Sequence, residues 1–214
     1  MSSESHRRTL LDTWTETSAH VFDSVVAANR AAFAAFGVTG DAVPTENGAD
    51  AGTEAPSAVE AIEARETKSD WEVTVTVHRP ENMGVGDRVA FSKTITDDDI
   101  HRFALASGDT NPLHLDDDFA EQTRFRGRIA HGTLVGGLIS AALARLPGLT
   151  IYLSQDLEFH NPVRIDDRVD AVCEIVEDLG DDQYRLTTRV YDETRDEVII
   201  DGEAVVLIDE LPEE

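Results

Sequence analysis

Lysine, cysteine and long apolar runs are scarce in this chain of 214 residues. Its only lysines are Lys68 and Lys93, and Cys173 is its one cysteine. One cysteine excludes an internal disulfide, and the strand-like alternation around Cys173 predicts a buried, unreactive thiol. No apolar run reaches the length of a membrane span, and the N-terminus lacks the basic and apolar regions of a secretion signal. We therefore expect a cytoplasmic protein without a membrane span.

The chain also has few positive charges of any kind. Acidic residues outnumber basic ones by 43 to 18, and the formal net charge is -25. This charge, with no basic stripe, argues against binding to nucleic acid or anionic membranes. Hydrophobic residues make up 41 % of the chain, which indicates that the acids lie on the surface of a folded protein. We interpret such a surface as typical of a salt-loaded cytoplasm, such as that of a halophilic archaeon. An ordinary acidic mesophilic protein is the alternative.

The hydrophobic pattern divides the chain into three parts. Within residues 1–38, apolar residues at spacings of three, four or seven predict an amphipathic helix from about Thr9 to Phe36. Residues 39–70 are rich in Gly, Ala, Glu, Thr and Pro, and we interpret them as a flexible acidic linker. Residues 71–214 hold the other predicted elements and form the main domain.

In the main domain, strand patterns surround one central helix. Thr96 is a predicted N-cap, followed by three aspartates, for a short helix that ends near Ala106. His131 to Leu146 are predicted as the central helix, and Asp116 to Glu121 as a brief helical turn. Alternation predicts strands over residues 71–77, 88–95, 149–159, 168–177, 184–191 and 198–208. This order implies an α+β domain with a largely antiparallel sheet over a helix.

An acid and an imidazole lie five residues apart in Ser107-Gly108-Asp109-Thr110-Asn111-Pro112-Leu113-His114. Gly108 and Pro112 form turns readily, and Asn111 readily bonds to its own backbone, so the segment is predicted to be a loop. Asp109 and His114 are the right pair to hold and deprotonate one water molecule. The alternative is a surface turn with an incidental histidine.

Ordered blocks of the main domain carry a family pattern over about Gly86 to Ile208. They are Gly86-Asp87-Arg88-Val89, Phe103 to Asp109, Asn111 to Asp116, Ile129-Ala130-His131-Gly132, Ile151 to Phe159, Asn161-Pro162-Val163 and Gly202 to Val206. Together they resemble the MaoC-like (R)-specific enoyl-CoA hydratases, which have the hot-dog fold, a sheet wrapped around a central helix. The resemblance implies reversible addition of water to a trans-2-enoyl-CoA, with no cofactor, to give the (R)-3-hydroxyacyl-CoA.

The resemblance also implies the roles of particular residues. Asp109 and His114 match the catalytic pair, without an assignment of each proton transfer to one of them. The backbone N–H of Gly132 matches the donor to the enolate oxygen at a helix start, where a plain turn is the alternative. The candidate supports are Asn111, His131 and Ser140, and helix packing is the alternative role for Ser140.

The one local basic cluster consists of Arg124, Arg126 and Arg128. It is a candidate site for CoA phosphates, since arginine suits phosphate recognition, and charge balance with nearby acids is the alternative. No group of His, Cys and acidic residues has convincing metal-ligand spacing, and hydration requires no metal. His101 and His160 are interpreted as ordinary surface or strand-end residues.

Three functions remain open at this point. The leading one is the hydratase, supplying polyhydroxyalkanoate monomers or serving fatty-acid metabolism. The alternatives are a hot-dog thioesterase and a non-catalytic granule-associated scaffold, and the intact Asp–His block favours hydration. The family's paired central helices imply a homodimer or a higher homo-oligomer. The N-terminal helix is a candidate contact for a partner protein or a polymer granule, or it packs on its own domain.

The acidic surface predicts that the protein depends on salt. In molar KCl the Debye length is roughly 3 Å, so like charges barely repel, whereas dilute buffer leaves the repulsion unscreened. We expect unfolding or dissociation on dialysis from molar KCl into low salt, followed by circular dichroism and size-exclusion chromatography. Full retention of structure in low salt would contradict the halophilic interpretation.

Overall fold

The computed structural model describes residues 70–211. The helix predicted within residues 1–38, and the linker predicted over 39–70 apart from Asp70, lie outside the described residues and stay predictions. None of the helices between residues 70 and 211 has the length and apolar content needed to cross a membrane. The strands are β1 (Glu72–Val75), β2 (Arg88–Thr94), β3 (Leu149–Phe159), β4 (Arg168–Gly180), β5 (Gln183–Asp192) and β6 (Glu197–Asp209). The helices are α3 (Asp97–Ser107), α4 (Pro112–Leu115), α5 (Asp117–Glu121) and α6 (Gly132–Leu143), with a 3-10 helix, η1 (Pro80–Asn82).

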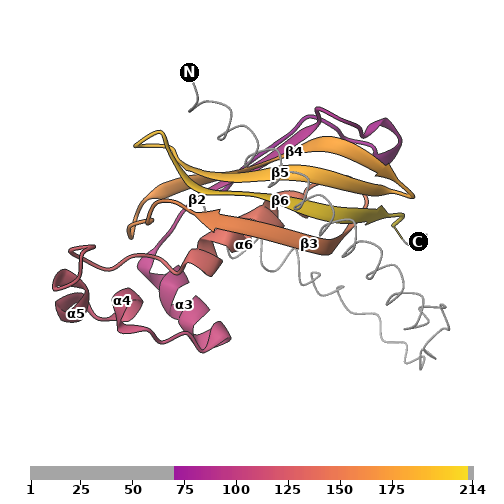
Figure 1. The fold of residues 1–214 in the computed structure, drawn as a ribbon. Helices are drawn as coiled ribbons and strands as arrows, with labels where there is room; N and C mark the ends of the chain where they lie inside the picture. The colour runs from indigo at the N-terminus through magenta and orange to yellow at the C-terminus, as the bar shows by residue number, and fades with distance from the viewer. Residues whose placement is uncertain (1–69, 212–214) are drawn as a thin grey trace, which may run out of the picture. The chain divides into compact units, whose positions relative to one another are not determined.

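The strands form one six-stranded sheet in the order β1-β2-β4-β5-β6-β3. Every neighbouring pair is antiparallel, and β1 joins this sheet by pairing with β2. Helix α6 lies against one face of the sheet (Figure 1). Helices α3, α4 and α5 lie near the N-terminal end of α6. The predicted α+β architecture, an antiparallel sheet over a central helix, is confirmed.

The core lies between α6 and the sheet. The buried residues of α6 are Val135, Leu138, Ile139, Ala142 and Leu143. They pack with buried side chains of four strands, among them Val89, Phe91, Val169, Ala171, Cys173, Ile175, Leu186, Ile200 and Val206. Each large apolar side chain so buried contributes about 1.5–3 kcal/mol, and this packing holds α6 against the sheet.

The predicted starts of α3 and α6 are confirmed to within one residue, and the predicted end of α6 is three residues too late. Thr96 caps α3: its hydroxyl accepts from the Asp99 N–H at 3.2 Å, and the Asp99 carboxylate accepts from the Thr96 N–H at 2.9 Å. Helix α6 ends at Leu143, earlier than Leu146, because the last N–H groups bond to carbonyls three residues back. Leu146 itself bonds to Leu143 in this way.

Two glycines allow β3 to lie close to its neighbours. A Cβ on Gly202 of β6 would lie 2.0 Å from the Asp156 carbonyl oxygen of β3. A Cβ on Gly136 of α6 would lie 3.2 Å from Leu157 Cδ1, also on β3. Only a hydrogen atom therefore fits at Gly202, where the neighbour is backbone, whereas a Cβ at Gly136 would require the Leu157 side chain to shift slightly.

The thiol of Cys173 is fully buried in β4, as predicted. Burial raises the pKa of Cys173 to about 12, because the surrounding apolar side chains cannot solvate a thiolate. The group is thus a packing residue and not a nucleophile.

Replacement of Gly202 tests the close approach of β3 and β6. We expect Gly202→Ala to lose at least about 1–3 kcal/mol of unfolding free energy, since the methyl group would meet backbone that cannot rotate away. Gly84→Ala is the matched control, because its added Cβ meets nothing within 4 Å. Thermal unfolding of both variants in molar KCl measures the difference, and equal stability would refute this account of the sheet.

Candidate active site

Asp109 lies directly after the end of α3. Gly108 ends that helix in the left-handed conformation, with φ of 78°, and turns the chain toward the site. The Asp109 N–H donates to Ser107 Oγ at 3.1 Å, and one carboxylate oxygen accepts from the Asn111 N–H at 3.2 Å. These local bonds hold an exposed carboxylate in one orientation.

His114 lies on a one-turn helix, α4, where we had predicted a continuous loop. The reason is local: the Asn111 side chain caps the turn by accepting from the Leu113 N–H at 3.0 Å, and Pro112 occupies the first helical position. We still propose that Asn111 helps to hold the catalytic pair in place. The cap on α4 is the physical basis for this proposal. The loop prediction is right for Asp109 and wrong for His114.

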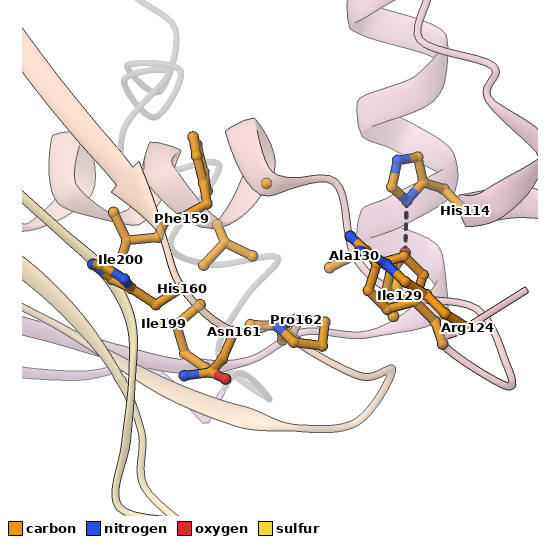
Figure 2. Close-up of a pocket in the computed structure, with 14 residues that line it drawn as sticks. His114, Arg124, Ile129, Ala130, Phe159, His160, Asn161, Pro162, Ile199 and Ile200 are labelled. Atoms are coloured by element: carbon orange, nitrogen blue, oxygen red, sulfur yellow. Dashed lines mark hydrogen bonds between the residues drawn. The ribbon is translucent and has the colours of Figure 1, made fainter.

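The His114 ring is buried and fixed by one hydrogen bond. Its Nδ1 lies 2.8 Å from the Ile129 carbonyl oxygen, the dashed line in Figure 2. A carbonyl oxygen only accepts, so Nδ1 carries the hydrogen and neutral His114 keeps a free lone pair on Nε2. This ring is therefore set to receive a proton at Nε2.

The structure brings Asp109, His114 and His131 together. A carboxylate oxygen of Asp109 and one ring nitrogen of each histidine lie within 4.8 Å of one another. A water that bonds to two such atoms at about 2.8 Å each can span up to roughly 5.6 Å, so one molecule fits between the carboxylate and His114. The sequence predicted the acid–imidazole pair, and the fold adds the second imidazole.

Three such side chains also resemble a metal-ligand set, which the spacing along the chain did not suggest. The His114 and His131 ring centroids lie 4.0 Å apart, and the ring planes are tilted by 33°. In each ring one nitrogen already faces a main-chain carbonyl oxygen, that of Ile129 for His114 Nδ1 and that of Asp109 for His131 Nε2. We interpret the cluster as a water-holding site, as the sequence predicts for Asp109 and His114.

Gly132 opens α6 beside the pair. The N-cap residue His131 makes no side-chain cap, so the first N–H groups of α6 are free of such a bond within residues 70–211. Gly132 and His114 line a cavity of about 250 Å³. A Cβ on Gly132 would lie 2.9 Å from a carbon of the Phe159 ring, so a larger residue would displace the wall of this cavity.

The cavity is lined by apolar side chains together with several polar ones. Its walls come from the start of α6, the end of β3 and the segment after it, and the start of β6 (Figure 2). The apolar lining is Phe125, Ile129, Ala130, Val135, Phe159, Pro162, Val163, Ile199 and Ile200, and the polar lining is His114, Arg124, His160 and Asn161. A shape of this kind suits an apolar ligand with one polar end.

Two residues differ from their predicted surroundings. His160, interpreted as an ordinary strand-end residue, does follow β3 but also lines the cavity. Ser140 is exposed on α6, eight residues after Gly132 or about 12 Å along the helix. It is therefore not part of the Asp109–His114 cluster within this chain. The wall residue Phe159 lay in a block of the family pattern, and only the fold places it against Gly132.

The three arginines of the basic cluster have different environments. Arg128 donates to Asp117 at 2.8 Å and to Asp97 at 2.7 Å. Hydrogen bonding to Asp117 raises the pKa of Arg128 against the effect of burial, and Asp97 adds to the rise. Arg124 and Arg126 are exposed, and neither forms an ion pair with any residue between 70 and 211. Charge balance with nearby acids, the alternative role for this cluster, thus holds for Arg128 and not for Arg124 or Arg126 within residues 70–211.

A fourth arginine, not singled out from the sequence, holds the loop that carries this cluster. Arg164 donates to the Phe125 carbonyl oxygen at 2.5 Å and to the Gly127 carbonyl oxygen at 3.3 Å. Both carbonyls flank Arg126, which has the left-handed φ of 57°. The loop at the mouth of the cavity is therefore tied to the segment before β4 through its backbone.

A helix wrapped by an antiparallel sheet, with an acid–imidazole pair beside the helix start, is the arrangement of a hot-dog hydro-lyase. The family model of the MaoC like domain matches residues 82–197, more than half of the chain, and the chain belongs to this family.

Curated relatives and a solved structure agree with this assignment. The (R)-specific enoyl-CoA hydratase of Rhodospirillum rubrum is 41% identical over 134 residues, which is 62% of this chain and 92% of that protein. The 3-hydroxybutyryl-CoA dehydratase of Methylorubrum extorquens is 43% identical over 130 residues, 60% of this chain and 82% of that one. The unliganded R-hydratase PhaJ1 of Pseudomonas aeruginosa superposes with a TM-score of 0.59 at 36% identity, covering 67% of this chain and 96% of that one. The predicted hot-dog fold is confirmed.

Proposed function

We propose that the protein is a hydro-lyase that adds water reversibly to a trans-2-enoyl-CoA and forms the (R)-3-hydroxyacyl-CoA. The observation that carries this proposal is the approach of the Asp109 carboxylate and the His114 imidazole to within 4.8 Å, next to an apolar cavity. Relatives that are named as enoyl-CoA hydratase and hydroxybutyryl-CoA dehydratase support both directions of the same reaction.

Asp109 and His114 hold the attacking water between them. One of the two takes a proton as the water oxygen bonds to the β-carbon, the double-bond electrons move toward the thioester oxygen, and a proton is delivered to the α-carbon. The bare Nε2 of neutral His114 suits proton uptake, because Nδ1–H is already bound to the Ile129 carbonyl. Positioned proton transfer of this kind is typically worth about 10²–10⁴-fold in rate. Because the addition of water leaves the overall oxidation level of the acyl group unchanged, the reaction calls for no redox cofactor.

The start of α6 stabilises the enolate. The Gly132 N–H is free of any side-chain cap and lines the same cavity as His114. It can therefore donate to the thioester oxygen as negative charge develops there, with the partial positive charge of the helix N-terminus behind it. The absence of a Cβ at Gly132 lets the thioester come close.

A second copy of the chain is the expected partner. Strand β3 is an edge of the sheet and exposes Leu149, Tyr152 and Phe159. A long edge with apolar side chains is normally covered by another strand or chain. We therefore propose a homodimer, in which the domain over residues 71–214 is the catalytic unit.

Replacement of the pair tests the reaction. We expect Asp109→Asn and His114→Asn each to lower kcat for crotonyl-CoA by about 10²–10⁴-fold in molar KCl, since each removes one proton acceptor. The loss of enoyl-thioester absorbance and the chirality of the product are measured. Asp118→Asn and His101→Asn are the controls, because both side chains are exposed and neither belongs to the Asp109–His114–His131 cluster.

The same assay separates the alternatives. Release of free CoA would identify a thioesterase, and no reaction by folded wild-type protein with crotonyl-CoA or longer enoyl-CoAs would favour a non-catalytic scaffold.

Arg124 and Arg126 are the proposed contacts for the CoA phosphates. We expect Arg124→Ala combined with Arg126→Ala to raise KM for crotonyl-CoA by about 3–10-fold, the scale of two exposed ion pairs. KM for crotonyl-pantetheine, which lacks the nucleotide, should not change. Arg79→Ala is the control, since Arg79 is exposed and pairs with Glu81 at 3.8 Å. An equal rise for both substrates would remove the phosphate contact.

A further inference from the structure

His131 joins the separate parts of the site. Its Nε2 lies 3.0 Å from the main-chain carbonyl oxygen of Asp109. Its ring lies against the His114 ring, with centroids 4.0 Å apart and the planes tilted by 33°, and it packs against Phe103 at 4.9 Å. It is also the residue directly before Gly132, where α6 begins. One side chain thus contacts the loop of the acid, the ring of the base and the helix start.

The hydrogen bond fixes which form of the His131 ring is present. The Asp109 carbonyl can only accept, so Nε2 carries the hydrogen and donates it. Nδ1 is buried and has no hydrogen-bond partner among residues 70–211. A second proton there would create a buried donor without an acceptor, next to another imidazole. Burial lowers the pKa of His131, repulsion from His114 lowers it further, and the carbonyl and charge of Asp109 act in the opposite direction.

We propose that His131 is the positioning residue of the catalytic pair. Its Nε2–H holds the Asp109 peptide, so that the carboxylate is aimed at the water site, and its neutral ring is the flat wall against which His114 rests. His131 is 1 % exposed and is not among the residues that line the cavity, so it acts through its two neighbours and not on the substrate. This proposal rests on the proposed hydratase function and assigns the arrangement of that site to one further side chain.

Matched variants separate the donor from the ring. His131→Phe keeps an aromatic ring for stacking but has no N–H. His131→Gln can place an amide N–H near the position of Nε2, whereas His131→Asn places it near Nδ1. We expect kcat of His131→Phe on crotonyl-CoA to fall by about 10–100-fold with KM changed less than about 3-fold, because a shift of about 1 Å in a catalytic group has effects of this size. His131→Gln should recover most of the loss, and His131→Asn should not.

Crystal structures of the same variants test the proposal without turnover. The distance between the Asp109 carboxylate and the His114 ring should lengthen in His131→Phe and stay as in the wild type in His131→Gln. An unmoved Asp109 loop in a folded His131→Phe protein would overturn the positioning role, as would wild-type kcat in that variant or equal activity of the Gln and Asn variants. If wild-type protein does not hydrate crotonyl-CoA or longer enoyl-CoAs, the proposed function fails, and the crystal structures still decide the role of His131.

Discussion

A buried hydrogen bond of 2.8 Å, from His114 Nδ1 to the Ile129 carbonyl, joins the two halves of the site. Ile129 lies just before α6, and α6 is held by its apolar packing under the sheet. The helix α4 is a single turn without stability of its own, and it takes its position from this bond and from Leu115, which packs against the core. The position of His114 in the pocket therefore depends on the core packing of α6 and on the hydrogen bond at His114 Nδ1.

Much of the fold and the identity of the pair could be predicted, because both depend on short-range patterns. The alternation of apolar residues predicted the bounds of β3 correctly. The threonine before three aspartates correctly predicted the N-cap of α3 at Thr96. The roles of the three clustered arginines could not be predicted, since the partner Asp97 lies 31 residues from Arg128. The position of Phe159 over Gly132 likewise depends on how β3 crosses the start of α6, which the alternation of the strand does not specify.

Arginine, and not lysine, carries the positive charge in this acidic chain. Two arginines each form ion pairs with three carboxylates. The partners of Arg168 are Asp70, Glu72 and Glu193. The partners of Arg195 are Asp167, Asp192 and Glu197. The planar guanidinium bonds to several carboxylates at once, which an ammonium group does less well. Each pair between exposed groups is worth at most about 1 kcal/mol and chiefly reduces repulsion among the acids. The Asp192 carboxylate is different, because it is fully buried and is held by Arg195 and by the N–H groups of Thr194 and Arg195.

The single buried thiol has a consequence for how this protein can be studied. Cys173 pairs across the sheet with Val89 of β2 and Thr188 of β5, in the middle of the strand order. A small reagent can reach it only when the sheet separates, so the rate of thiol alkylation reports the population of opened molecules. This readout needs no introduced cysteine, because the chain has one thiol. The alkylation rate of Cys173 therefore measures how often the domain opens.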